Sequence, residues 1–153
     1  MDTSKLYIKM CDCPEIQGKW AVKEGDFYYC FCRDLPDYPN GYGVTILMPE
    51  EADVGNNELI ESDTDVWLPR QDQIQNMLLG KFSLDGMLDC FNSFWNRNAW
   101  LSDDTPGQPY PDLPEDYGIF YFFESVEQLW LAFYMKEMCG KIWDGDRWIA
   151  IEP

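Results

Sequence analysis

Residues 125–140, SVEQLWLAFYMKEMCG, decide the fold more than any other stretch of the chain. The seven residues 129–135 are all apolar or aromatic, so a helix here is apolar nearly all round and belongs in a core. Ser125 and Gln128 have the spacing of a capping box at its start, and Gly140 suits its end. We predict a helix over 126–139 at the centre of the core.

Two segments before this one also have helical spacing. Pro69 suits the first turn of a helix through 70–79, with Gly80 past its end. Ser83 suits the N-cap of a helix over 84–96. The second helix has one apolar face, formed by Leu84, Met87, Leu88, Phe91 and Trp95.

The remaining apolar segments favour strands. Residues 5–11, KLYIKMC, alternate like a half-buried strand, and residues 27–32, 42–48 and 118–123 are rich in aromatic or β-branched side chains. Residues 141–151 predict a hairpin that turns at Asp144-Gly145. Residues 15–22 fit either a helical turn or an irregular crossing. The order predicts a single α+β domain over residues 1–153, with N-terminal antiparallel strands, three helices and a C-terminal hairpin.

The charge of the chain is unusual and uneven. It has 28 acids, 11 bases and no histidine, which gives a net charge of −17. Residues 34–69 hold nine acids and no base, and residues 98–135 hold seven acids and no base. Prolines and charged residues predict exposed acidic loops at about 49–65 and 101–118. Nucleic acid would be repelled by such a chain, so direct binding to it is not expected.

The acidic blocks predict a basic protein partner, in particular a nucleic-acid-binding protein whose basic groove the carboxylates occupy in place of phosphates. Nearby aromatic side chains would supply apolar anchors. The alternative is that the charge only keeps an aromatic-rich protein soluble, although a net charge of magnitude about 2–8 is enough for that in a small domain. The residues predicted to bind the partner are Glu50, Glu51, Asp53, Glu58, Glu61, Asp63, Asp65, Asp103, Asp104, Asp112, Glu115, Asp116, Trp100, Tyr110 and Tyr117.

Four thiols carry a second hypothesis, a zinc-stabilised structural or regulatory module. Cys11, Cys13, Cys30 and Cys32 form two Cys-x-Cys pairs, and in a strand each pair would present both sulfurs on one face. Four such sulfurs from neighbouring strands could bind Zn²⁺, although the spacing is not that of zinc knuckles. Zinc is the one cofactor considered; otherwise none is expected.

Enzymatic activity is not expected. The absence of histidine excludes Ser-His-Asp and Cys-His catalysis, and no phosphate-binding or EF-hand motif occurs. The third hypothesis is therefore a carboxylate-based hydrolase, with Glu124 and Glu127, or Asp144 and Asp146, as an acid/base pair. Against it, Glu127 falls in a first helical turn and Asp144 in a turn, where acids are common for structural reasons.

The location predicted from the sequence is the cytoplasm. No run of about 18 apolar residues could span a membrane, and the N-terminus lacks the pattern of a secretory signal. The six cysteines are therefore expected as thiols or metal ligands.

Three segments carry a family resemblance: PEIQGKW with KEGD (14–26), DVWLPRQDQIQNML (65–78) and FFESVEQLWLAFYMKEMCGKIWDGDRWI (122–149). They resemble a family of small uncharacterised acidic proteins encoded by bacteriophages and prophages of Gram-positive bacteria. The Cys30-Phe31-Cys32 pair is not part of that family pattern. The resemblance implies a phage or prophage origin, and the cytoplasm of a bacterial host, without any assigned activity. By analogy, such an origin favours an inhibitor of a host nucleic-acid enzyme, such as a DNA mimic or an anti-CRISPR or anti-restriction protein.

Overall fold

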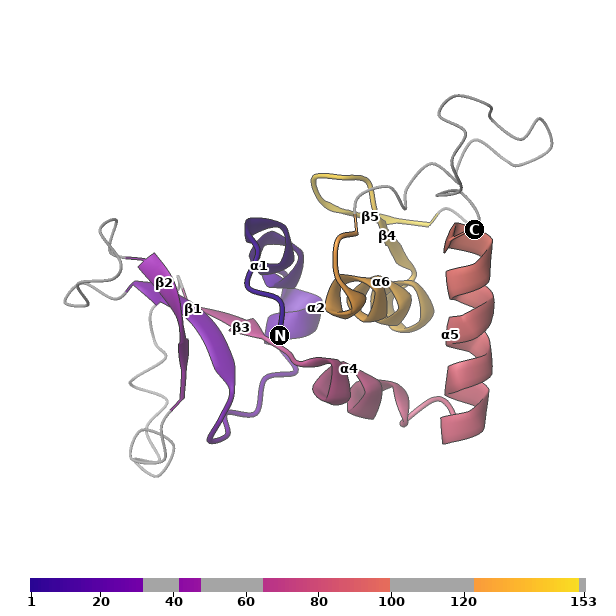
Figure 1. The fold of residues 1–153 in the computed structure, drawn as a ribbon, viewed down its shortest axis with the longest axis horizontal. Coiled ribbons are helices and arrows are strands. Elements are labelled where there is room, and N and C mark those ends of the chain that lie inside the picture. The colour runs from indigo at the N-terminus through magenta and orange to yellow at the C-terminus, as the bar shows by residue number, and fades with distance from the viewer. Residues whose placement is uncertain (32–41, 48–64, 100–122, 152–153) are drawn as a thin grey trace. The chain divides into compact units, whose positions relative to one another are not determined.

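The computed structural model describes residues 1–31, 42–47, 65–99 and 123–151, and it confirms the α+β class (Figure 1). The chain divides into two compact units, Met1–Arg70 and Gln71–Pro153, and each is described by itself. The predicted acidic loops, except Asp65, and most of the predicted strand at 118–123 lie outside the described residues.

The first unit contains two short helices and a three-stranded antiparallel sheet. The helices are α1 (Lys5–Cys11) and α2 (Pro14–Gln17), and the strands are β1 (Phe27–Phe31), β2 (Tyr42–Ile46) and β3 (Val66–Leu68). The strand order is β2-β1-β3, with Tyr29 paired to Val44 on one side and to Val66 on the other. The strands predicted at 27–32 and 42–48 are confirmed.

The strand predicted at residues 5–11 is wrong, because this segment forms helix α1. The Ser4 side chain caps it by accepting a hydrogen bond from the Tyr7 N–H. The fully buried residues are Tyr7, Met10 and Cys11, at i, i+3 and i+4, which is helical spacing. The apolar alternation of the sequence suggested a strand. However, Leu6 and Ile8 are only half-buried, so the buried residues do not follow a period of two.

Two distant segments, 14–26 and 65–70, hold the first unit together. The Trp20 ring stacks parallel to the Trp67 ring with centroids 6.2 Å apart. Its indole N–H donates to the buried Asp26 carboxylate at 3.0 Å, which also accepts the Lys23 N–H at 2.9 Å. The Arg70 guanidinium donates to the carbonyl of Gly25 at 2.9 Å. These contacts fix the turn at residues 23–26, which directly precedes β1, to Trp20 and Arg70.

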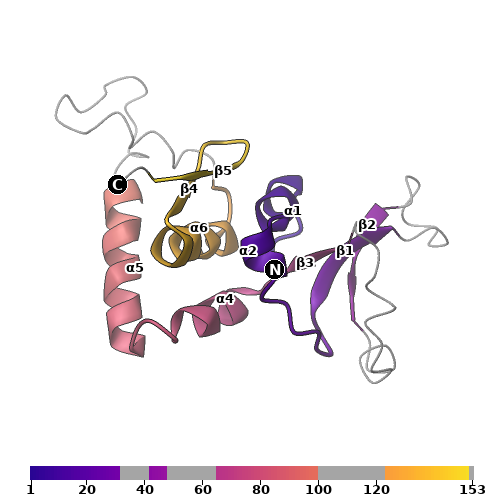
Figure 2. The same ribbon diagram turned by 180° about the vertical axis from the view of Figure 1, so that it is seen from behind.

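The second unit is built around one central helix. Its elements are α4 (Gln71–Leu78), α5 (Leu84–Ala99), α6 (Val126–Cys139) and a hairpin of β4 (Lys141–Trp143) and β5 (Trp148–Ala150). All three predicted helices and the predicted hairpin are confirmed. Within this unit α4, α5 and the hairpin lie on different sides of α6 (Figures 1 and 2).

Helix α6 has the ends and the burial that its sequence predicts. The Ser125 hydroxyl accepts the Gln128 N–H at 3.1 Å, and Gly140 ends the helix in the left-handed conformation at φ 62°. Residues 130–135 are all buried. The side-chain carbonyl of the buried Gln128 accepts the N–H of Glu124, one residue before the N-cap, at 2.9 Å. Ser125 and Gln128 thus each accept one backbone N–H at the start of α6, much as in a capping box.

Aromatic rings join α5 to α6. The Phe91 ring stacks on the Trp130 ring at 3.6 Å and 4°, and Phe94 and Phe133 lie 5.3 Å apart. Met87 and Phe94 are buried on the same side of α5. These aromatic contacts along one side of α5 form one part of the core of this unit, and they determine which face of α5 stays exposed.

Candidate functional site

The predicted partner-binding residues fall almost entirely outside the described residues. Of the fifteen, only Asp65 is described; it lies half-buried directly before β3, and burial raises the pKa of its carboxyl. Burying a carboxylate costs free energy, so Asp65 is a poor choice for an exposed contact with a basic partner. The other fourteen positions stay predictions.

The described framework is much less acidic than the whole chain. Residues 1–31, 42–47, 65–99 and 123–151 hold fourteen of the 28 acids but ten of the eleven bases. The other segments hold the remaining fourteen acids and one base, Arg33. Most of the net charge of −17 is therefore carried by the segments outside this framework.

The thiols are not arranged as the zinc hypothesis assumed. Cys11 is the last residue of α1 and Cys13 is the N-cap of α2, so the argument from strand geometry is wrong for this pair. Cys30 is buried on β1, and Cys32 lies outside the described residues. In the described part of the chain no group of three or more Cys, Asp or Glu side chains could hold a metal ion. Zinc binding by all four thiols stays a hypothesis.

The two N-terminal thiols are held in the protonated form. Burial raises the pKa of Cys13 to about 11 and raises the pKa of Cys11 well above its usual value. The Cys13 thiol also lies 3.7 Å from the Met10 carbonyl, to which it donates. Because the thiolate is both the nucleophile and the metal ligand, these two cysteines are poor nucleophiles and poor metal ligands in this fold.

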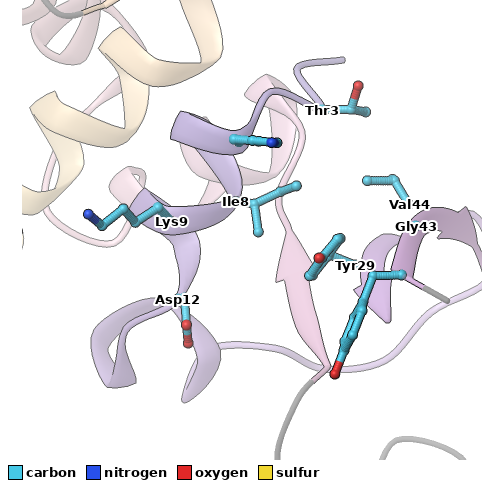
Figure 3. A pocket seen from close by; sticks show the side chains of 9 residues that line it. Thr3, Ile8, Lys9, Asp12, Tyr29, Gly43 and Val44 are labelled. Carbon is cyan, nitrogen blue, oxygen red and sulfur yellow. The ribbon is translucent and has the colours of Figure 1, made fainter. Parts of the chain in front are cut away.

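An open groove of about 720 Å³ lies in the first unit between α1 and the β1–β2 pair. Figure 3 shows Ile8 pointing from α1 toward Tyr29, with Val44 beyond, whereas Lys9 extends away from them. The Tyr29 ring stacks with the Tyr42 ring at 5.7 Å and 18° on the strand side. The full lining is Thr3, Lys5, Ile8, Lys9, Asp12, Tyr29, Tyr42, Gly43 and Val44.

The groove supplies aromatic and apolar contact surface, and the residues Lys5, Lys9 and Asp12 line its helical side. This combination suits binding of a small ligand or a short peptide segment. Its lining has a single carboxylate, Asp12, so it is not the two-carboxylate cleft that the hydrolase hypothesis requires. The sequence did not reveal the groove, because a strand over 5–11 would put Lys5 and Ile8 on opposite faces, whereas a helix brings them together.

The proposed acid/base residues occupy structural positions. Asp144 is exposed in the hairpin turn, where its carboxylate accepts the N–H groups of Asp146 and Arg147, both at 2.8 Å. These hydrogen bonds lower the pKa of Asp144, and the N–H of Arg147 contributes more than the N–H of Asp146. Glu127 lies in the first turn of α6, as expected for an acid near a helix N-terminus.

No helix in the described ranges is both long enough and apolar enough to cross a membrane. Comparison with known proteins gave no match to any protein-family model, to any curated protein or to any solved structure.

Proposed function

We propose that this chain is a non-enzymatic interaction protein of phage or prophage origin that binds a basic, nucleic-acid-handling protein of the bacterial host. Its acidic segments would occupy the groove that normally receives phosphates, as a DNA mimic or an anti-CRISPR or anti-restriction inhibitor does. Long-range attraction between opposite charges speeds association and selects basic partners.

The observation that carries the proposal is the uneven division of charge. A framework with fourteen acids and ten bases needs few further acids to stay soluble, yet the joining segments add thirteen more against one base. Solubility alone asks for a net charge of magnitude about 2–8. Trp100, Tyr110 and Tyr117 lie in the same part of the sequence as the second acidic block, and aromatic side chains commonly anchor interfaces.

The test neutralises one acidic block and compares it with an equal change in the framework. The block variant converts Asp103, Asp104, Asp112, Glu115 and Asp116 to the corresponding amides. The control variant does the same to five exposed framework acids, Asp12, Glu24, Asp72, Glu124 and Asp146. Both variants change the net charge by the same amount, so a difference between them reports position and not total charge.

Partners are captured from host lysate at low salt and at 0.5 M NaCl and are identified by mass spectrometry. We expect the natural chain and the control to retain a nucleic-acid-binding protein at low salt, and the block variant to lose it. Duplex DNA added in excess should compete for the same partner. Equal retention by all three chains, or binding that does not respond to salt, would refute the proposal.

A further inference from the structure

Helix α5 presents an exposed apolar stripe beside its seam with α6. Leu84, Leu88 and Trp95 are 58%, 47% and 38% exposed, and the half-buried Phe91 lies between the last two. Their spacings of four, three and four residues place all four side chains in one narrow band along the helix. Large apolar side chains that line up in this way on a soluble protein usually mark an interaction surface.

The stripe is distinct from the side of α5 that builds the core. Met87 and Phe94 are buried toward α6, and the Phe91 ring stacks on Trp130. Figures 1 and 2 show α5 beside α6, with no other described element of this unit along its far side. Leu84, Leu88 and Trp95 accordingly keep between 38% and 58% of their surface exposed.

The charge next to the stripe specifies the kind of partner. Asp85 and Asp89 are exposed one turn apart on the side of α5 away from the core seam. No Lys or Arg occurs between Lys81 and Arg97, and Lys81 forms a salt bridge with Glu137 at 3.1 Å. An occupant of the stripe thus meets an apolar band with an acidic row along one border.

We propose that α5 docks a basic amphipathic helix of a protein partner. The 4-3-4 spacing is the one with which a second helix interdigitates its own apolar face. Lysines or arginines bordering that face would lie against Asp85 and Asp89. The inference rests on the proposed function for the kind of partner, and it adds a second contact surface that belongs to the described framework.

A second copy of this chain fits the stripe less well. Each copy carries a net charge of −17, so association would bring two strongly negative molecules together. Asp85 and Asp89 of each copy would also border a helix that offers no base between Lys81 and Arg97. A basic helix satisfies both the apolar band and the acidic row.

The experiment titrates the full chain with a synthetic 18-residue helical peptide that has leucine on one face and lysine elsewhere, and measures Kd by calorimetry. A second peptide replaces the leucines by serine, and a third replaces the lysines by glutamate. The variant protein is Leu84→Ser with Leu88→Ser. Its matched control is Leu79→Ser with Val126→Ser, which removes two similarly exposed apolar side chains from the same unit.

We expect the leucine/lysine peptide to bind the natural chain and the matched control equally, and to bind the Leu84→Ser/Leu88→Ser variant about tenfold more weakly or worse. Asp85→Asn with Asp89→Asn should weaken binding and reduce its salt dependence. The serine/lysine peptide has no apolar face and can interact only through charge. It should therefore bind weakly, and with the same affinity to the natural chain and to the Leu84→Ser/Leu88→Ser variant. The leucine/glutamate peptide should not bind.

Equal affinity of the leucine/lysine peptide for the stripe variant and the natural chain would overturn the inference. So would a dimer in sedimentation at micromolar concentration that the stripe variant abolishes, since the stripe would then serve self-association. If the block variant loses the captured host protein while the stripe variant keeps it with natural affinity, the proposed function stands and the inference fails. Loss of capture by the stripe variant alone supports the inference and counts against the acidic blocks.

Discussion

The side-chain amide of Gln17 completes the backbone hydrogen bonding of Trp67, fifty residues further along the chain. The Gln17 carbonyl oxygen accepts the Trp67 N–H at 2.9 Å, and its amide nitrogen donates to the Trp67 carbonyl at 3.1 Å. The same nitrogen donates to the Cys11 carbonyl at 2.8 Å. One side chain thereby links the end of α1, the end of α2 and strand β3.

Replacing Gln17 with alanine is expected to destabilise the first unit. The change leaves the N–H and carbonyl of the buried Trp67 and the carbonyl of Cys11 without this partner, at a cost of about 1–3 kcal/mol. Urea unfolding followed by tryptophan fluorescence measures the loss as a lower midpoint. Gln75→Ala on α4 is the matched control and should leave the midpoint nearly unchanged. An equal effect of the two substitutions would contradict the role of Gln17.

Gly140→Ala is expected to lower stability through backbone strain alone. Gly140 has a φ of 62°, and no atom lies within 4 Å of where a Cβ would be, so the cost comes from the left-handed conformation, at about 1 kcal/mol. Thermal unfolding should show a decrease of roughly 2–4 °C. Gly80→Ala, where φ is not positive, serves as the control. A smaller decrease for Gly140 than for Gly80 would refute the explanation.

The cysteines should react with iodoacetamide in the order of their exposure. At pH 8 a thiol with a pKa of about 11 is ionised in only about one molecule in a thousand, so Cys13 should react slowly and the fully buried Cys11 more slowly still. Cys90 is exposed on α5 and should react faster than both. Peptide mass spectrometry at timed intervals reads the order. Unfolding in urea should bring the three rates together; rapid labelling of Cys13 in the folded chain would contradict its burial.

Asp65 and Asp144 should affect the pH dependence of stability in opposite directions. Burial raises the pKa of Asp65, so the folded chain binds its proton more tightly than the unfolded chain does. The stability from this carboxyl is full below its unfolded pKa and is lost as the pH rises through its folded pKa. Asp65→Asn should therefore raise the unfolding midpoint at pH 7, and the gain should shrink as the pH falls through the raised pKa of Asp65 and be absent below about 4.

Asp144 provides the comparison of opposite sign. The N–H groups of Arg147 and Asp146 lower its pKa, so its contribution is present above the unfolded pKa and is lost as the pH falls through the folded value. Asp144→Ala should lower the midpoint at pH 7 and have less effect near pH 2. Urea titrations of both variants across this pH range measure the two trends. Parallel curves for the two variants would show that the assigned causes are wrong.

The helices of the second unit could be predicted because local signals and burial agree there. Ser125, the apolar run 129–135 and Gly140 all point to the same helix, and α6 has these bounds. In α1 the signals disagreed. Its short length leaves few turns in which a period of 3.6 can be told from a period of two, and the capping by Ser4 was the signal that could have decided for a helix.

The candidate surfaces were harder to predict, because a sequence pattern does not say which apolar side chains meet each other. The spacing placed Leu84, Met87, Leu88, Phe91 and Trp95 on one apolar face of α5, as the structure has it. Only the position of α6 separates that face into a buried part at Met87 and an exposed part at Leu84 and Leu88. The groove beside α1 was missed for the related reason that the helix itself was missed.

The Gln17 amide also affects how this sheet can meet other chains. β3 is an edge strand, and an edge strand normally offers unpaired N–H and carbonyl groups onto which a stray strand can add, the first step toward aggregation. At Trp67 those two groups are already taken by a side chain of the same molecule. Gln17 therefore blocks the addition of another strand at the central residue of this three-residue edge. Its replacement should lower the solubility of the chain on refolding as well as its stability.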